Sequence, residues 1–171
     1  MFYVDFPTFS SHVATTLTPM IKLRRLLFVI PLLGLVSTAL ADCEKGSKVV
    51  FSCSTSKNKI IEVCDAGKSI SYSYGVQSKK PEIVVSAPRA QASTTQFSGF
   101  GKTMNHSVEV PNGNTTYSVV YSLPLSSKKD IEPEQAGVSV IINKKEVAKV
   151  MCDFRKPFVE HIENIKLSAT Q

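Results

Sequence analysis

The sequence predicts an all-β domain, an antiparallel β-sandwich or small barrel of about eight or nine strands. Beyond residue 42 the apolar residues recur at a period of two rather than 3.6, in short runs separated by Gly, Pro, Asn and Lys pairs. Short strands at regular spacing are typical of sandwiches and closed barrels. The expected strands lie near residues 48–54, 59–64, 68–75, 81–86, 94–100, 105–110, 115–123, 137–143 and 146–152.

Turn residues join these strands into hairpins. The clearest hairpin turns at Asn112-Gly113, because both residues suit the positive φ angles of a tight turn and alternating Val and Tyr residues flank them. A second hairpin is expected around residues 143–145. After Pro157 the apolar residues recur at helical spacing, which predicts a short C-terminal helix or helical turn.

Residues 20–41 have the three parts of a secretory signal peptide. A basic stretch at 22–25 precedes an apolar stretch at 26–36, and Ala39-Leu40-Ala41 is a small-x-small cleavage site. The apolar stretch is shorter than the roughly 20 residues of a membrane-spanning helix and contains a proline and a glycine. We therefore expect a mature chain that starts at Asp42, has no stable membrane insertion and is periplasmic or secreted.

The remaining chain predicts one domain. Residues 1–19 are interpreted as an over-long start or an extended n-region, and residues 42–171 as a single β domain of 130 residues with one modest core. This part keeps 17 of the 20 Lys and Arg residues and 13 of the 14 Asp and Glu residues, a net charge of +4. Its lysines are scattered in pairs rather than gathered in a stripe, which argues against nucleic-acid binding.

All four cysteines, Cys43, Cys53, Cys64 and Cys152, follow the signal peptide, which predicts two disulfides formed in an oxidising compartment. Cys53 and Cys64 flank a turn. If the turn is tight, Cys53 lies opposite Glu62 and the two cysteines share a face diagonally, so a direct bridge is one option. The favoured option pairs Cys43 and Cys152 each with one of these two. Intervals of 9, 10 and 87 residues lack the close ligand pairs of zinc sites, so no metal is expected.

No motif places a catalytic nucleophile, general base or metal in this chain. His106 is more simply interpreted as a solvated strand histidine than as a general base. Glu132 and Glu134 fall in an acidic loop beside Pro133 and are interpreted as a solvated turn. The sequence therefore predicts a binding protein without a cofactor, rather than an enzyme.

Residues 88–102 form the expected recognition segment. It combines an arginine donor fork, rigid aromatic rings and glycines that allow close approach of a partner backbone. The candidate binding residues are Arg89, Phe97, Ser98, Gly99, Phe100 and Lys102.

Export, disulfides, the all-β pattern and Ser98-Gly99 together resemble the bacterial periplasmic lysozyme inhibitors, which insert a Ser-Gly-x-x-Tyr loop into the lysozyme cleft. This chain has Lys102 at the tyrosine position. The resemblance implies a protein-recognition or inhibitor module that acts on a periplasmic or extracellular protein. The alternatives are small-molecule or glycan binding and a structural role in surface assembly. A pocket with convergent polar groups would favour a ligand binder or an enzyme, and a protruding Ser/Gly-rich loop on a filled core would favour an inhibitor.

Overall fold

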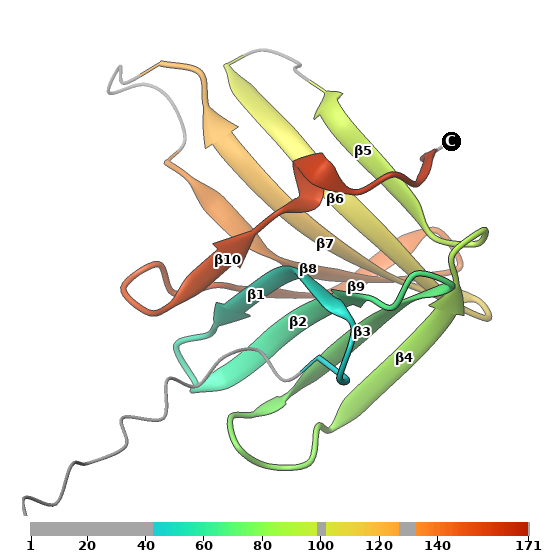
Figure 1. Ribbon diagram of the computed structural model, residues 1–171. Helices are drawn as coiled ribbons and strands as arrows, with labels where there is room; N and C mark the ends of the chain where they lie inside the picture. Colours follow the sequence, from blue (N-terminus) through green and yellow to red (C-terminus); the bar gives the residue numbers. More distant parts are fainter. Residues whose placement is uncertain (1–42, 99–101, 127–132, 171) are drawn as a thin grey trace, which may run out of the picture. The chain divides into compact units, whose positions relative to one another are not determined.

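The computed structural model describes residues 43–98, 102–126 and 133–170, which form two β-sheets and no α-helix (Figure 1). The expected leader, residues 1–41, lies outside this range. One sheet has five strands in the order β10-β1-β2-β3-β4, and the other has six in the order β11-β5-β6-β7-β8-β9. The strands are β1 (Lys48–Ser54), β2 (Lys59–Asp65), β3 (Ser69–Val76), β4 (Ile83–Pro88), β5 (Ser93–Ser98), β6 (Thr103–Asn112), β7 (Thr115–Pro124), β8 (Gln135–Ile142), β9 (Lys145–Met151), β10 (Phe158–Glu160) and β11 (Ser168–Ala169).

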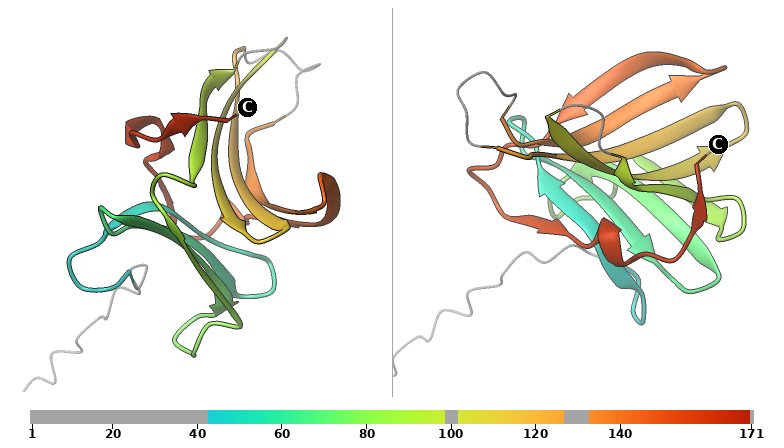
Figure 2. Two further views of the ribbon diagram at one scale, coloured as in Figure 1. Left: turned by 90° about the vertical axis from the view of Figure 1, so that its right-hand side faces the viewer. Right: turned by 90° about the horizontal axis from the view of Figure 1, so that it is seen from above.

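The all-β prediction is confirmed, and the fold is sandwich-like rather than a closed barrel. Each of the nine expected strands is present as β1 to β9, and β10 and β11 are additional. The expected C-terminal helix is instead the single 3-10 turn η1 (Ile162–Asn164), because Ile165 returns to extended backbone. Figure 2 shows that the six-stranded sheet is strongly curved.

The core fills the space between the two sheets. The five-stranded sheet contributes large apolar side chains, and the six-stranded sheet contributes a layer of valines from β6, β7 and β8. Successive side chains of a strand point to opposite faces of the sheet, so every second residue of a central strand enters the core. The fully buried members include Phe51, Ile61, Val63, Ile70, Tyr72, Val108, Val110, Val119 and Val138.

Two disulfides join Cys43 to Cys64 and Cys53 to Cys152, which confirms the favoured pairing. The expected register of the first hairpin is wrong by one residue, because Cys53 lies opposite Ile61 rather than Glu62. The turn is wider than a tight turn, since the Thr55 N–H donates to the Lys59 carbonyl. Cys53 therefore shares the face of Ile61, and Cys64, three residues further along β2, lies on the opposite face. A direct Cys53–Cys64 bridge is incompatible with this register.

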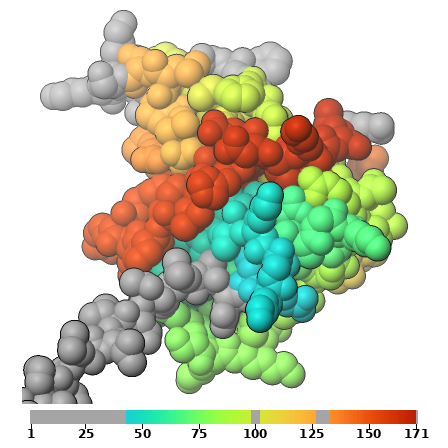
Figure 3. All heavy atoms as spheres, viewed as in Figure 1, coloured from blue at the N-terminus to red at the C-terminus, as the bar shows by residue number. Residues whose placement is uncertain are grey.

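Residues 158–170, here called the C-terminal strap, connect the two sheets. β10 pairs with β1 of the five-stranded sheet, and β11 pairs in parallel with β5 of the six-stranded sheet. Gln96 fixes the middle of the strap by donating to the carbonyls of Ile162 and Ile165, at 3.2 and 2.7 Å. In the space-filling view the strap runs as a continuous band between the strands of the two sheets (Figure 3).

Candidate functional site

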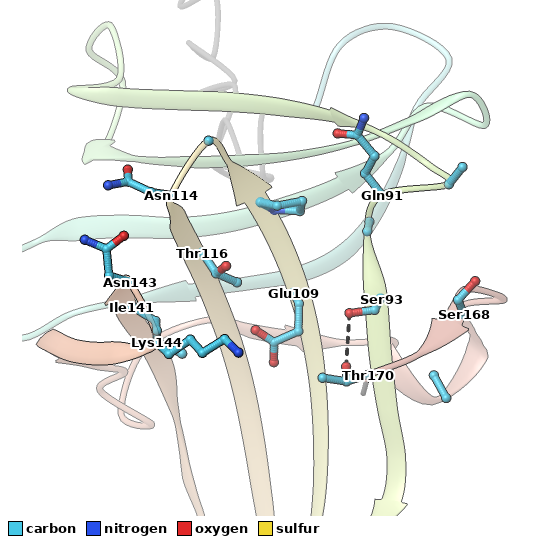
Figure 4. Close-up of a pocket in the computed structure, with 15 residues that line it drawn as sticks. Gln91, Ser93, Glu109, Asn114, Thr116, Ile141, Asn143, Lys144, Ser168 and Thr170 are labelled. Atoms are coloured by element: carbon cyan, nitrogen blue, oxygen red, sulfur yellow. Dashed lines mark hydrogen bonds between the residues drawn. The ribbon is translucent and has the colours of Figure 1, made fainter.

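A groove of 840 Å³ lies on the outward face of the six-stranded sheet (Figure 4). Val108 and Val110 point into the core, so Glu109 between them points outward into this groove. The walls come from the loop before β5, the β6–β7 turn, the β8–β9 turn and β11. We call this the sheet groove. Its polar lining residues are Gln91, Ser93, Glu109, Asn114, Thr116, Asn143, Lys144, Ser168 and Thr170.

Strand register aligns a polar row on this face. Ser93, Glu109, Ser118 and Ser139 lie directly opposite one another on β5, β6, β7 and β8. Ser118 and Ser139 are buried although they point away from the core. The outward face is therefore a polar surface with a fixed arrangement of small hydroxyl side chains around one carboxylate.

The Glu109 carboxylate is positioned by two serines. Its Oε1 accepts hydrogen bonds from the Ser118 hydroxyl at 2.8 Å and from the Ser107 hydroxyl at 3.1 Å. Burial raises the pKa of Glu109, and the two hydroxyl donors act in the opposite direction. In the part of the chain that the structure describes, Oε2 accepts no hydrogen bond and no cation lies within ion-pair distance of Glu109. This oxygen can therefore accept a hydrogen bond from a ligand.

The rims of the sheet groove carry donors and acceptors. Asn143 and Lys144 form the β8–β9 turn with φ angles of 50° and 66°, and of these two residues asparagine adopts this left-handed region with less strain. On the other rim, the Thr170 hydroxyl donates to Ser93 Oγ at 3.1 Å. Figure 4 shows Glu109 between these two rims. Hydrogen-bond donors on the rims and the Glu109 acceptor therefore line the same groove.

A second groove of 490 Å³, here called the basic groove, adjoins the first. Ala90 and Ser168 line both grooves. Three cationic side chains and no carboxylate appear among its lining residues, which are Gly67, Lys68, Pro88, Arg89, Ala90, Lys166, Leu167 and Ser168.

Arg89 organises the basic groove. Its Nη1 donates to Asp65 at 2.6 Å and its Nη2 donates to the carbonyl of Lys166 at 3.0 Å. Burial alone would raise the pKa of Asp65, but the hydrogen bond and charge of Arg89 and the Gly67 N–H outweigh it and lower that pKa. Arg89 thus ties the C-terminal strap to the β2–β3 turn.

The structure does not bring the expected recognition residues together. Arg89 precedes β5, whereas Phe97 and Ser98 end that strand and Lys102 follows. Phe97 is 58% exposed at a φ of 57°, inside the bulge where β5 slips against β6. Lys102 is exposed, and its carbonyl accepts the Leu125 N–H at 2.8 Å. Gly99 and Phe100, also expected in the site, lie outside the described residues.

His106 is a core residue, so its interpretation as a solvated strand histidine is wrong. It lies on the same face of β6 as Val108, is 2% exposed and contacts the Phe97 ring, with centroids 5.0 Å apart. Its Nδ1 is 3.9 Å from the Glu160 carboxylate on the strap. Among the described residues neither ring nitrogen has a hydrogen-bond partner.

Cys43, Glu62 and Cys64 bring their ligand atoms within 4.8 Å of one another. Both sulfurs belong to one disulfide, so the cluster offers no thiolate to a metal ion.

Two disulfides indicate an oxidising, extracytoplasmic environment. Over residues 43–98, 102–126 and 133–170, no helix has the length and apolar character needed to cross a membrane.

Searches against protein-family models, curated proteins and solved structures found no match to this chain.

Sequence reasoning missed Glu109, Ser118 and Lys166. The signal for the first two was present, because polar residues alternate with the core valines of β6 and β7. Lys166 reaches the basic groove only through contacts distant in sequence, which periodicity does not reveal.

Proposed function

We propose that this chain is an exported binding protein, acting in the periplasm or outside the cell, whose sheet groove takes a polar, hydroxyl-rich ligand such as a short glycan. The single observation that supports this most is the Glu109 carboxylate, which lines the groove, is held by two serines through Oε1 and has no hydrogen bond to Oε2 among the described residues. Groups that are positioned in advance bind with a smaller loss of side-chain entropy.

The lining fits hydroxyl groups by its chemistry. Carboxylate, amide and hydroxyl side chains supply both acceptors and donors, as each sugar hydroxyl requires. None of the described residues that line the sheet groove is aromatic, so hydrogen bonding rather than ring stacking would give the affinity. Such a groove is the feature that favours ligand binding over an inhibitor role.

Ligand titration of residues 42–171 tests the proposal. Oligosaccharides of defined composition are added to the isotopically labelled domain, and amide shifts are followed by NMR. We expect shifts around Glu109, Thr116 and Asn143, and a loss of affinity of at least tenfold in Glu109→Gln. Glu146→Gln is the matched control, because Glu146 is an exposed carboxylate on β9 and does not line the groove. Shifts elsewhere, or equal affinity in the two variants, would overturn the proposal.

Protein recognition is the second candidate, and Phe97 favours it. Positive φ at a non-glycine residue costs roughly 1–2 kcal/mol, and here it holds an aromatic ring that is mostly exposed. Strain of this kind clusters at functional sites. Capture of periplasmic and cell-wall proteins, including lysozyme, by the wild type and by Phe97→Ala tests this candidate. Equal capture by both would exclude Phe97 as an interface anchor.

A further inference from the structure

We infer that the ligand of the sheet groove is an acidic saccharide, whose carboxylate or phosphate occupies the basic groove beside Lys68 and Lys166. The inference rests on the proposed glycan-binding function. It extends that function by naming the class of ligand and its orientation.

The basic groove gathers positive charge that the protein itself leaves mostly uncompensated. Asp65 offsets Arg89. Lys68 and Lys166 are exposed, and neither has a carboxylate within ion-pair distance among the described residues. Like charges held around one groove repel each other, and a bound anion relieves that repulsion.

The fold builds this cluster from three separate parts of the chain. Lys68 lies in the β2–β3 turn, Arg89 follows β4 and Lys166 belongs to the C-terminal strap. The Arg89 N–H donates to the Lys68 carbonyl at 2.9 Å, and the Arg89 guanidinium holds the Lys166 carbonyl. Arg89 therefore positions both lysines through their backbones, and their ammonium groups are left for a ligand.

The two grooves form one path. Because Ala90 and Ser168 line both, a ligand of a few sugar units can lie across them. The sheet groove is lined by one carboxylate, Glu109, and one cation, Lys144, so its charges balance, whereas the basic groove is lined by three cations and no carboxylate. An anion is therefore attracted more strongly to the basic groove than to the Glu109 end. This pattern fixes the direction of the ligand, with hydroxyl groups at Glu109 and the acidic group at the basic groove.

Matched sugar pairs test the inference. Trigalacturonate is compared with the neutral galactose trisaccharide, and glucose 6-phosphate with glucose, by calorimetry at low and at moderate salt. We expect the acidic member of at least one pair to bind at least tenfold more tightly, with an advantage that salt reduces. The pair that shows the advantage identifies the anion as a carboxylate or as a phosphate.

The variant Lys68→Gln/Lys166→Gln should lose that advantage. Lys79→Gln/Lys80→Gln is the control, because it removes the same charge from a turn beyond the far end of β3, on the order of 25 Å away. Arg89 is left unchanged because it holds the strap.

Two outcomes would overturn the inference. Equal binding of acidic and neutral sugars, with both weakened by Glu109→Gln, would leave the proposed function standing and exclude the anionic ligand. Retention of the acidic preference in Lys68→Gln/Lys166→Gln would place the anion elsewhere. A different result separates the two proposals: a salt-sensitive phosphate or carboxylate site that Glu109→Gln does not affect would support the basic groove and overturn the function proposed for the sheet groove.

Discussion

The two disulfides should stabilise the domain unequally, because they close loops of different length. Cys53–Cys152 spans a sequence separation of 99 and Cys43–Cys64 one of 21. A cross-link removes entropy from the unfolded chain in proportion to the logarithm of loop length, which gives about 4.7 kcal/mol for the long loop and about 3.3 kcal/mol for the short one. We therefore expect Cys53→Ala/Cys152→Ala to be the less stable of the two double variants by about 1.4 kcal/mol.

The comparison is internally controlled. Each disulfide includes one buried strand cysteine, Cys53 in one and Cys64 in the other, so the loss of packed sulfur is similar. Urea denaturation at neutral pH gives the free energy of unfolding of each variant beside the wild type. Equal losses, or a larger loss in Cys43→Ala/Cys64→Ala, would refute the loop-length reasoning and point to native-state contacts of the N-terminal bridge.

Three further outcomes are expected. Glu109→Gln should raise the free energy of unfolding at pH 7, because burial raises the pKa of Glu109 and the folded state therefore carries the cost of its charge. Urea denaturation at several pH values should show this gain disappearing below pH 4.5, where Glu109 is protonated in the folded and unfolded states alike. Arg89→Met should cost about 1 kcal/mol at neutral pH. The folded pKa of Asp65 lies below 3.8, so the stability difference between the wild type and Arg89→Met should shrink as the pH falls through that folded pKa. An unchanged stability difference at pH 2 would contradict the pairing of Arg89 with Asp65. Gly137→Ala should lower the melting temperature through a loss of roughly 1–3 kcal/mol, because a Cβ there meets the Val150 carbonyl oxygen, and an unaltered melting curve would count against this contact.

The strands β1 to β9 could be predicted because short runs of apolar and β-branched residues are separated by turn residues, even where a strand is buried on both faces, as in β2, or exposed along its length, as in β9. β10 and β11 could not, since they contain three and two residues and exist by pairing with β1 and β5. The first hairpin was placed correctly but in the wrong register. Its turn runs from Thr55 to Lys59, with Asn58 at a φ of 56°, a geometry that the sequence pattern does not specify.

The candidate site was predictable only in part, for a related reason. The segment 88–102 does line both grooves through Arg89, Gln91 and Ser93, but Phe97 lies at the far end of β5. Aromatic and arginine residues are common interface anchors, so a sequence pattern that contains them favours a binding site at those residues. The polar residues that alternate with the core valines have the composition of ordinary solvated strand positions, so the sequence pattern does not mark them as a site.

The same register that specifies the core also specifies the sheet groove. If β6 slipped by one residue against β7, Glu109 would enter the core and Val108 would face the groove, so the slip would bury a charge and expose an apolar side chain. The opposition of Glu109 to Ser118, and of Ser118 to Ser139, is therefore enforced by the valines on the other face of the strands. The core register does not specify the basic groove in this way, because Lys166 reaches Lys68 only where the C-terminal strap is held by Arg89. Substitutions that loosen the strap should thus disturb the basic groove and the β11 rim of the sheet groove, and leave the pairing of Glu109 with Ser118 intact.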